Sequence, residues 1–360
     1  MASANPRIVL PTTAHKRVEG YPSHSRWLDT LSVITSALFV LGLFLDGWAH
    51  NSIPKLETFF TPWHAVLYSG FFSVAILMGG TQYRNVGKGY AWSRALPQGY
   101  GLSLLGVVIF FIGGAGDMVW HTVFGVEQNL EALFSPTHLL LATGAFLFIA
   151  GPLRSAWQRT GLHGWRDLYP AILSMTLLFT LFTFFMQYAN VFGNANVLNM
   201  PTPSGSSRYF IEVSSVVYVL VPAALMMATL LFLVRRWQLP FGSATLMFTF
   251  NALLMFLMRI NFNGQYGLIV VAAALGGLVA DILIARLQPS AERHNALRLF
   301  AFVVPAVYFL LVFGAIVLSG PRGLWWEIHT WLGVPFVAGA IGIGMSLLLV
   351  PPPIPNEKTN

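Results

Sequence analysis

The 360-residue chain contains no cysteine and few charged residues. The absence of cysteine excludes disulfide bonds, iron–sulfur clusters, thiolate zinc sites and cysteine nucleophiles. Charged residues make up only 9% of the chain and hydrophobic residues 56%, whereas an average soluble domain is roughly 25% charged. This composition excludes a typical cytosolic enzyme, a disordered protein and a nucleic-acid-binding domain. It predicts a protein whose solvent is the lipid bilayer.

Ten segments are long and apolar enough to cross a bilayer, since a membrane-spanning helix needs about 20 such residues. They are residues 29–50, 62–81, 99–121, 136–153, 168–189, 209–234, 241–260, 266–285, 299–319 and 328–350. We therefore predict an all-α, polytopic integral membrane bundle of about ten transmembrane helices. The stretch 1–26 is polar and does not resemble a cleavable signal peptide, so we expect the first span to be retained as an anchor.

The lysines and arginines predict how these spans are oriented. Sixteen of the 20 basic residues fall in the two tails or in alternate loops. Because positive residues favour the cytoplasmic side, both termini are expected there, in a multi-pass protein of the cell membrane. The predicted division is a cytoplasmic tail over 1–28, two metal-binding hairpins over 29–153, further transmembrane helices over 154–350, and a cytoplasmic tail over 351–360.

Two stretches in the N-terminal third resemble each other. Each has an aspartate, a histidine four residues later, and then F-[S/T]-P-x-H after a short loop. The first set is Asp46, His50 and His64, and the second set is Asp117, His121 and His138. The aspartates are 71 residues apart and the last histidines 74. This internal repeat predicts that two helical hairpins are copies of one unit.

The spacing predicts that the three side chains of each set converge. Residues four apart lie on one helix face, so the aspartate and the first histidine point the same way. Thr61 and Ser135 are good N-caps, and each precedes a proline at the favoured first helical position. The second histidine then lies in the first turn of the returning helix. Two imidazoles and one carboxylate form a recognised ligand set for a redox-active metal with open positions.

The same residues are also compatible with a structural role or with transport. Asp–His hydrogen bonds are common at helix ends, and Trp48, Trp63 and Trp120 are typical of the aromatic belt at a membrane interface. A proton- or metal-coupled transporter, or a non-catalytic membrane subunit, would also carry ionisable residues within its spans. Such residues cost about 2.5–3.5 kcal/mol each on insertion scales and therefore favour a function.

Several polar residues outside the two sets are weaker candidates. Four are acids or histidines in loops or at a span end, namely Glu127, Glu131, Glu327 and His329. The first two are either partners of the metal ligands or ordinary loop acids. The other two are either further ligands or a solvated pair, and we favour the solvated pair. Asp281 and Arg259 lie within or at the end of spans. We expect either to pair with an asparagine, the candidates being Asn251, Asn261 and Asn263.

At these motifs the sequence resembles the C subunit of the particulate, copper-dependent methane and ammonia monooxygenases, over roughly residues 40–145. That family has a membrane copper site built from D-x-x-x-H and F-T-P-x-H, with Trp before the first histidine and Thr after it. The second set here matches this pattern, including Trp120 and Thr122. The first set lacks that Trp and Thr, and Asp117 stands where the family's second set has Asn.

The resemblance implies copper, rather than iron or zinc, as the metal held by both sets. It implies an oxidoreductase, or a subunit of a membrane monooxygenase-like complex, acting with other membrane or cupredoxin-like subunits. The substrate expected is a small apolar molecule that arrives from the lipid. The topology places the metal sites near the outer, periplasmic or extracellular face. No catalytic side chain and no organic cofactor is assigned. The second site is expected to be tighter because it keeps Trp120, Thr122 and its loop acids.

Overall fold

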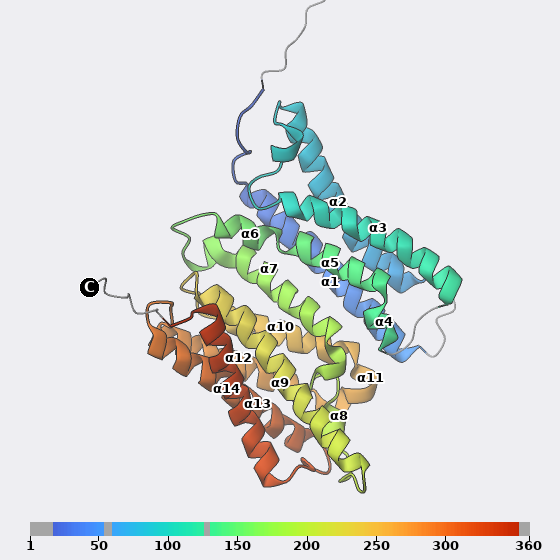
Figure 1. Ribbon diagram of the computed structural model, residues 1–360, viewed down its shortest axis with the longest axis vertical. Helices are drawn as coiled ribbons and strands as arrows, with labels where there is room; N and C mark the ends of the chain where they lie inside the picture. The colour runs from blue at the N-terminus through green and yellow to red at the C-terminus, as the bar shows by residue number, and fades with distance from the viewer. Residues whose placement is uncertain (1–16, 54–59, 126–129, 353–360) are drawn as a thin grey trace, which may run out of the picture.

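The computed structural model describes residues 17–53, 60–125 and 130–352, and these residues form a bundle of helices (Figure 1). Eight helices are long and apolar enough to cross a membrane without interruption. They are α1 (Arg26–Ser52), α2 (Pro62–Gly87), α3 (Gly101–Phe124), α7 (Gly164–Phe185), α9 (Ser207–Val234), α12 (Leu268–Leu287), α13 (His294–Ser319) and α14 (Ile328–Leu349). The described residues contain no strand, and the prediction of an all-α polytopic membrane bundle is confirmed.

Two further spans are bent. The first joins α5 (Pro136–Ile149) to α6 (Gly151–Trp157) with a bend of 41°. The second joins α10 (Ser243–Met258) to Ile260–Tyr266 with a bend of 89°. This last segment comprises α11 (Ile260–Asn263) and the 3₁₀ turn η3 (Gly264–Tyr266). Counting each bent pair as one span gives the ten that the sequence predicts.

Short helical turns lie between the spans. They are η1 (Trp92–Arg94), α4 (Glu131–Phe134), η2 (Gln187–Ala189) and α8 (Ala195–Leu198). The region 190–208, rich in Asn, Pro, Ser and Gly, is largely irregular around α8. Its first part is nevertheless part of the core, because Val191, Phe192 and Leu198 are almost completely buried.

The two N-terminal hairpins pack through matching close contacts. In the α1–α2 hairpin, a Cβ added to Gly70 would lie 2.5 Å from Cα of Phe39. In the α3–α5 hairpin, a Cβ added to Gly144 would lie 2.7 Å from the backbone nitrogen of Phe110. Each glycine lies six residues after the second histidine of its set, and each phenylalanine seven residues before the aspartate. Both hairpins therefore have a close backbone contact at the same place relative to their polar residues.

Aromatic rings join the two hairpins to each other. The Phe39 ring meets the Phe110 ring edge to face, with 5.2 Å between ring centroids, and Phe71 stacks on Phe110 at 4.4 Å. Phe148 of α5 completes this buried cluster. Such aromatic pairs contribute about 0.5–1.5 kcal/mol beyond the area they bury. The cluster gives both hairpins a common core.

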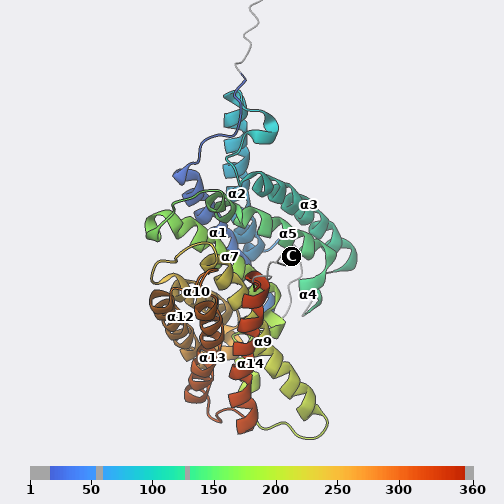
Figure 2. The same ribbon diagram turned by 60° about the vertical axis from the view of Figure 1, so that its left-hand side comes forward.

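The C-terminal helices form a second group, which meets the hairpins along α7 and α10. Helix α1 packs on both of these helices, while α12, α13, α14 and α9 follow one another around the far side. Figures 1 and 2 show the blue and teal hairpins at one end and the yellow to red helices at the other.

Asp281 of α12 is a structural residue of this second group. Its carboxylate accepts hydrogen bonds from the backbone N–H groups of Ala244 and Thr245, both at 3.0 Å, and from the Thr245 hydroxyl at 2.6 Å. It therefore caps the N-terminus of α10 from a neighbouring helix, where a negative charge is stabilised. The expectation that Asp281 pairs with an asparagine is wrong.

Candidate metal centres

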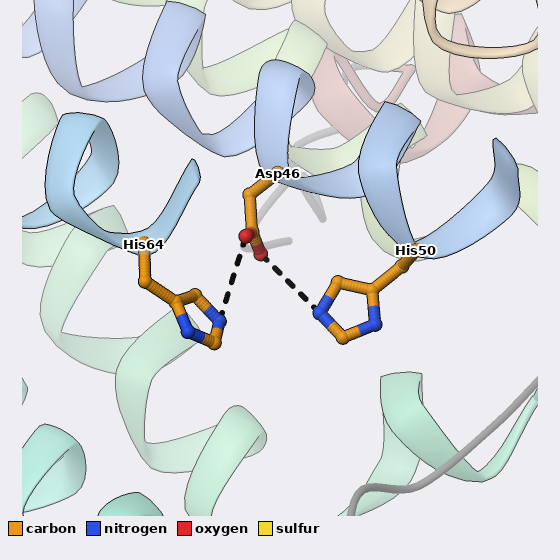
Figure 3. A group of neighbouring side chains, drawn as sticks. All are labelled: Asp46, His50 and His64. Atoms are coloured by element: carbon orange, nitrogen blue, oxygen red, sulfur yellow. Dashed lines mark ion pairs between the residues drawn. The ribbon is translucent and has the colours of Figure 1, made fainter. Parts of the chain in front are cut away.

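The first set of predicted ligands converges between α1 and α2 (Figure 3). Asp46 and His50 lie one turn apart on α1. Thr61 caps α2 by accepting a hydrogen bond from the backbone N–H of His64, which places His64 in the first turn. Oδ1 of Asp46 lies 3.5 Å from Nε2 of His64, and Oδ2 lies 3.6 Å from Nε2 of His50. The carboxylate thus faces both imidazoles.

The second set converges in the same way between α3 and α5. Asp117 and His121 lie one turn apart on α3, and Ser135 caps α5 so that His138 is in its first turn. Oδ2 of Asp117 lies 3.4 Å from Nε2 of His121, and Oδ1 lies 3.3 Å from Nε2 of His138. The six residues that the sequence singled out therefore form two three-residue groups.

The donor set of each group fits a metal ion. One ligand atom from each residue lies within 4.8 Å of the others, and no further group of three or more such residues occurs in the described part of the chain. Ligands at about 2.0–2.2 Å from one ion lie roughly 3–4 Å from each other. The nitrogen–oxygen distances given above fall in this range and are longer than ordinary hydrogen bonds. Oδ1 of Asp46 is buried and accepts no hydrogen bond from any described residue, so a cation would satisfy it.

The aspartate and the first histidine are more enclosed in the second group, whereas the second histidine is more enclosed in the first, with His64 13% and His138 22% exposed. The side chains of Asp117 and His121 are 3% and 5% exposed, whereas those of Asp46 and His50 are 12% and 27% exposed. Electrostatic interactions are stronger where water is excluded. A cation in the second group would therefore interact more strongly with its carboxylate.

Hydroxyl groups of the α5 first turn support the second group. The Thr137 hydroxyl donates a hydrogen bond to Oδ1 of Asp117 at 2.8 Å. The Ser135 hydroxyl lies 2.8 Å from Nδ1 of His138, within hydrogen-bond range. The first contact is made to Oδ1 of Asp117 and not to Oδ2, the oxygen nearer His121, and the second is made to Nδ1 of His138 and not to Nε2, which faces Asp117. Partners of this kind orient metal ligands and raise their affinity.

The backbone supports His121 in the same group. Nδ1 of His121 donates to the carbonyl of Gly125 at 3.2 Å. This bond places the proton on Nδ1 and leaves Nε2, which faces Asp117, as the nitrogen that takes a metal. No described residue makes an equivalent hydrogen bond with the ring of His50.

The first group lacks the hydroxyl that supports Asp117. The position before the second histidine is Thr137 in one motif and Trp63 in the other. Trp63 packs edge to face against Trp48, with 5.5 Å between ring centroids. The two hairpins thus differ in the neighbours of their candidate ligands.

Two of the residues expected to support the second site, Trp120 and Thr122, make other contacts. The Thr122 hydroxyl donates to the backbone carbonyl of Met118, and Trp120 packs against Phe124. Among the described residues, neither makes a hydrogen bond to a candidate ligand. Glu131 lies exposed on α4, and Glu127 lies outside the described residues. The sequence offered a hint that Ser135 and Thr137 are partners, because they flank the proline of the motif.

The other weak candidates lie apart from both groups. Glu327 pairs with Arg208 at 3.3 Å on the exposed surface, and His329 is exposed. Arg259 does contact an asparagine, as expected, but this is Asn51 of α1 rather than a residue near it in sequence. The sequence could not identify Asn51, because the contact joins residues 208 positions apart.

One cavity of about 640 Å³ touches both groups. Its wall includes five of the six candidate ligands, namely Asp46, His50, His64, Asp117 and His138. Tyr68, one turn after His64, also lines it, with 6.4 Å between the centroids of the two rings. The Tyr68 hydroxyl rests against Gly114 of α3, where an added Cβ would lie 3.0 Å from it. Tyr68 therefore reaches from the first hairpin to the second.

Comparisons with protein-family models, curated protein sequences and solved structures found no match for this chain.

Proposed function

We propose that the protein binds two metal ions, one in each hairpin, and acts as a membrane oxidoreductase or as the metal-binding subunit of one. The observation that carries this proposal is the convergence of one carboxylate and two imidazoles in each of two hairpins. The buried Oδ1 of Asp46, which accepts no hydrogen bond from the described residues, supports it. The equivalent positions of Gly70 and Gly144 support the further inference that the hairpins are copies of one unit.

Copper is the metal that we propose, with iron and zinc as alternatives. Imidazole and carboxylate ligands accept all three, and the motif resemblance to the copper monooxygenases favours copper. When bound, a redox metal with open positions supplies one-electron and dioxygen chemistry. The chain's own residues compensate the charge of the metal and hold its ligands in position. Asp46 and Asp117 offset the cation's charge, while Thr137 and Ser135 hold Asp117 and His138 in place.

The cavity is the proposed place for the substrate. Many of its lining side chains are apolar, among them Phe39, Leu43 and Phe110. Apolar walls with a few placed polar groups are typical of small-molecule sites. A small apolar molecule from the lipid would fit such a cavity, and other membrane or cupredoxin-like subunits would deliver electrons.

Metal-dependent oxidation tests this function. The purified protein in lipid nanodiscs is loaded with copper, iron or zinc and supplied with ascorbate and a small alkane or alkene. The proposal predicts dioxygen consumption and an oxygenated product with copper, neither with zinc, and loss of both in His138→Ala. Copper binding without any oxidation would support only the role of a metal-binding subunit. Oxidation that persists in His138→Ala would contradict a catalytic role for the second group.

We also propose that both termini are cytoplasmic and that the metal groups lie near the outer face. The charge distribution of the loops supports this orientation. Because the chain has no cysteine, single cysteines report position directly. Cysteines at Ser52 and Gln128 should react with a membrane-impermeant thiol reagent in intact cells, and one at Asn85 should not. The reverse pattern would place both groups at the inner face.

A metal-coupled transporter is the second candidate, and the bend of 89° after α10 is the observation that favours it. Discontinuous helices form the substrate sites of many transporters. Against it, the candidate ligands lie at helix ends rather than midway along the spans. Metal uptake into proteoliposomes separates the two. Uptake that His64→Ala abolishes would favour the transporter, and tight metal binding without uptake would favour the oxidoreductase.

A further inference from the structure

The cavity beside the two metal groups also has a positively charged residue in its wall, Arg259. Arg259 follows α10 at the point where the chain bends by 89° into Ile260–Tyr266. Non-helical backbone inside the apolar layer of a membrane is tolerated where it is buried in protein or lines a cavity. The bend therefore brings a guanidinium to the wall of the chamber that both hairpins share.

Neutral groups hold this guanidinium in place. Nε of Arg259 donates to the carbonyl of Gly193 at 3.4 Å, and Nη1 donates to Oδ1 of Asn51. The Arg259 guanidinium lies 5.0 Å from the centroid of the Phe262 ring, in a cation–π contact. Asn51 in turn donates to Oε1 of Gln187 at 3.4 Å. Arg259, Asn51 and Gln187 all line the cavity.

Arg259 has no negatively charged partner among the described residues. Its two hydrogen bonds go to an amide oxygen and a backbone carbonyl, and Nη2 makes none. Nη2 is also not one of the buried polar atoms that lack a partner, so it faces accessible space. An unpaired charge in apolar surroundings costs several kcal/mol. Ionisable residues within spans mark functional sites for this reason.

The charge of the cavity wall changes sign when metals bind. Without metal, the carboxylates of Asp46 and Asp117 outweigh Arg259. A divalent ion in each group outweighs its single carboxylate, because the histidine ligands are neutral. The loaded wall is then positive at both groups and at Arg259. In a site that excludes water, such a wall attracts an anion.

The cavity has room for more than an inorganic ion. Its volume of about 640 Å³ lies within the range of roughly 300–1,000 Å³ that is typical of small-molecule sites. Leu43, Leu181 and Phe184 are among its apolar lining residues. A planar guanidinium donor is matched to a carboxylate, and apolar side chains are matched to an aliphatic chain.

We propose that Arg259 binds the carboxylate of a small organic acid whose aliphatic chain lies in the cavity beside the metal groups. The inference rests on the proposed metal-binding function and gives its substrate an anionic group. For this cavity it replaces the wholly apolar molecule proposed above with one that carries a carboxylate.

Calorimetric titration of hexanoate into the Zn²⁺-loaded protein in lipid nanodiscs tests the proposal, because zinc is redox-silent and binding is read without turnover. We expect the zinc-loaded protein to bind hexanoate, and to bind hexanol at least about tenfold more weakly. The metal-free protein should bind neither ligand tightly. Affinity should rise from acetate to hexanoate. Binding of inorganic phosphate as tight as that of hexanoate would show a simple anion site and overturn the organic ligand.

Two variants of the arginine site give matched comparisons. Arg259→Gln should keep its zinc but bind hexanoate about tenfold more weakly, and the surface variant Arg208→Gln should bind it as the wild type does. Asn51→Asp places a carboxylate where Arg259 already makes a hydrogen bond, so it should fold, keep its zinc and lose hexanoate binding. Unchanged hexanoate affinity in both Arg259→Gln and Asn51→Asp would overturn the proposal.

A third variant tests whether an acidic residue of the chain itself neutralises Arg259. Glu57 lies outside the described residues, and Glu57→Gln should leave hexanoate affinity unchanged. A rise of about tenfold in this variant would show that Glu57 neutralises Arg259 and would overturn the proposal. The failures are separable: a protein that binds no zinc refutes the metal-binding function, whereas one that binds zinc but not hexanoate refutes only the role of Arg259.

Discussion

The two hairpins differ at the residue before the second histidine, which is Trp63 in the first and Thr137 in the second. Trp63 packs against Trp48, while the Thr137 hydroxyl donates to Asp117 at 2.8 Å. The same backbone arrangement thus places the two aspartates beside different neighbours. The first group keeps a buried carboxylate oxygen without a hydrogen bond from the described residues, and the second holds its carboxylate in place.

The two groups share the positions of their candidate ligands but differ in the hydrogen bonds that hold those ligands in place. Both groups bring three ligand atoms within 4.8 Å of each other. Among the residues that the structure describes, only those of the second group add hydrogen bonds to its aspartate and, through Gly125, to its first histidine. Supporting partners of this kind typically change metal affinity or activity by about 10–100-fold. The second site should therefore be the tighter one, for reasons other than Trp120 and Thr122.

Removal of each aspartate gives the largest expected effect on this comparison. Asp117→Ala should remove more metal than Asp46→Ala, because Asp117 is the more enclosed carboxylate and the better oriented one. Copper titration of each variant measures the affinity and number of the sites that remain. Equal losses would mean that the groups are equivalent or act as one centre. A larger loss from Asp46→Ala would make the first hairpin the principal site.

Removal of the Thr137 hydroxyl should have the next largest effect. Thr137→Val keeps the shape of the side chain and loses the hydrogen bond to Asp117, so the second site should bind metal about tenfold more weakly. Thr137→Ser keeps a hydroxyl and should retain most of the affinity. If the valine and serine variants bind metal equally, the hydrogen bond does not support the site.

The shared packing of the hairpins can be tested on folding stability. Gly70→Ala and Gly144→Ala each force a methyl group against the backbone of the partner helix, at 2.5 Å and 2.7 Å. Each should reduce the free energy of unfolding by about 1–3 kcal/mol, as overpacking does. Gly79→Ala is the control, since a Cβ there meets nothing within 4 Å, and it should stabilise the helix by up to about 1 kcal/mol. Thermal unfolding in nanodiscs compares all three, and a cost confined to one hairpin would contradict equivalent packing.

Transfer of the hydroxyl to the first hairpin should have the smallest effect. Trp63→Thr offers Oδ1 of Asp46 the kind of donor that Asp117 has, although it gives up the contact with Trp48. Trp63→Val loses the same contact without gaining a hydroxyl. The threonine variant should therefore bind metal in the first site a few-fold more tightly than the valine variant, since a typical hydrogen bond contributes about 0.5–1.5 kcal/mol net. Equal affinities would show that this position does not control the first site.

The sequence predicted what depends on local spacing. A distance of four residues on a helix, and a hydroxyl before a proline at a helix start, were enough to bring Asp46, His50 and His64 together. The ten spans followed from hydrophobic length, except that two of them are bent. The bend at Arg259 has no comparable local pattern, because no proline lies at that point.

The features that the sequence did not predict depend on packing between distant segments. Asp281 caps α10 from α12, and Arg259 contacts Asn51 across the bundle. The support from Thr137 also needs the α3–α5 geometry, since its partner lies 20 residues away on the other helix. Hydrogen bonds of this kind are specified only once the helices are in contact.

Elemental analysis of the purified protein tests the central claim most directly. Wild-type protein loaded with copper and washed should hold two metal ions per chain, corresponding to the two groups. His64→Ala and His138→Ala should each hold one, and the double variant none. His163→Ala, which changes an exposed histidine at the start of α7, should hold two. A wild-type protein without metal, or equal metal content in all of these variants, would contradict the account.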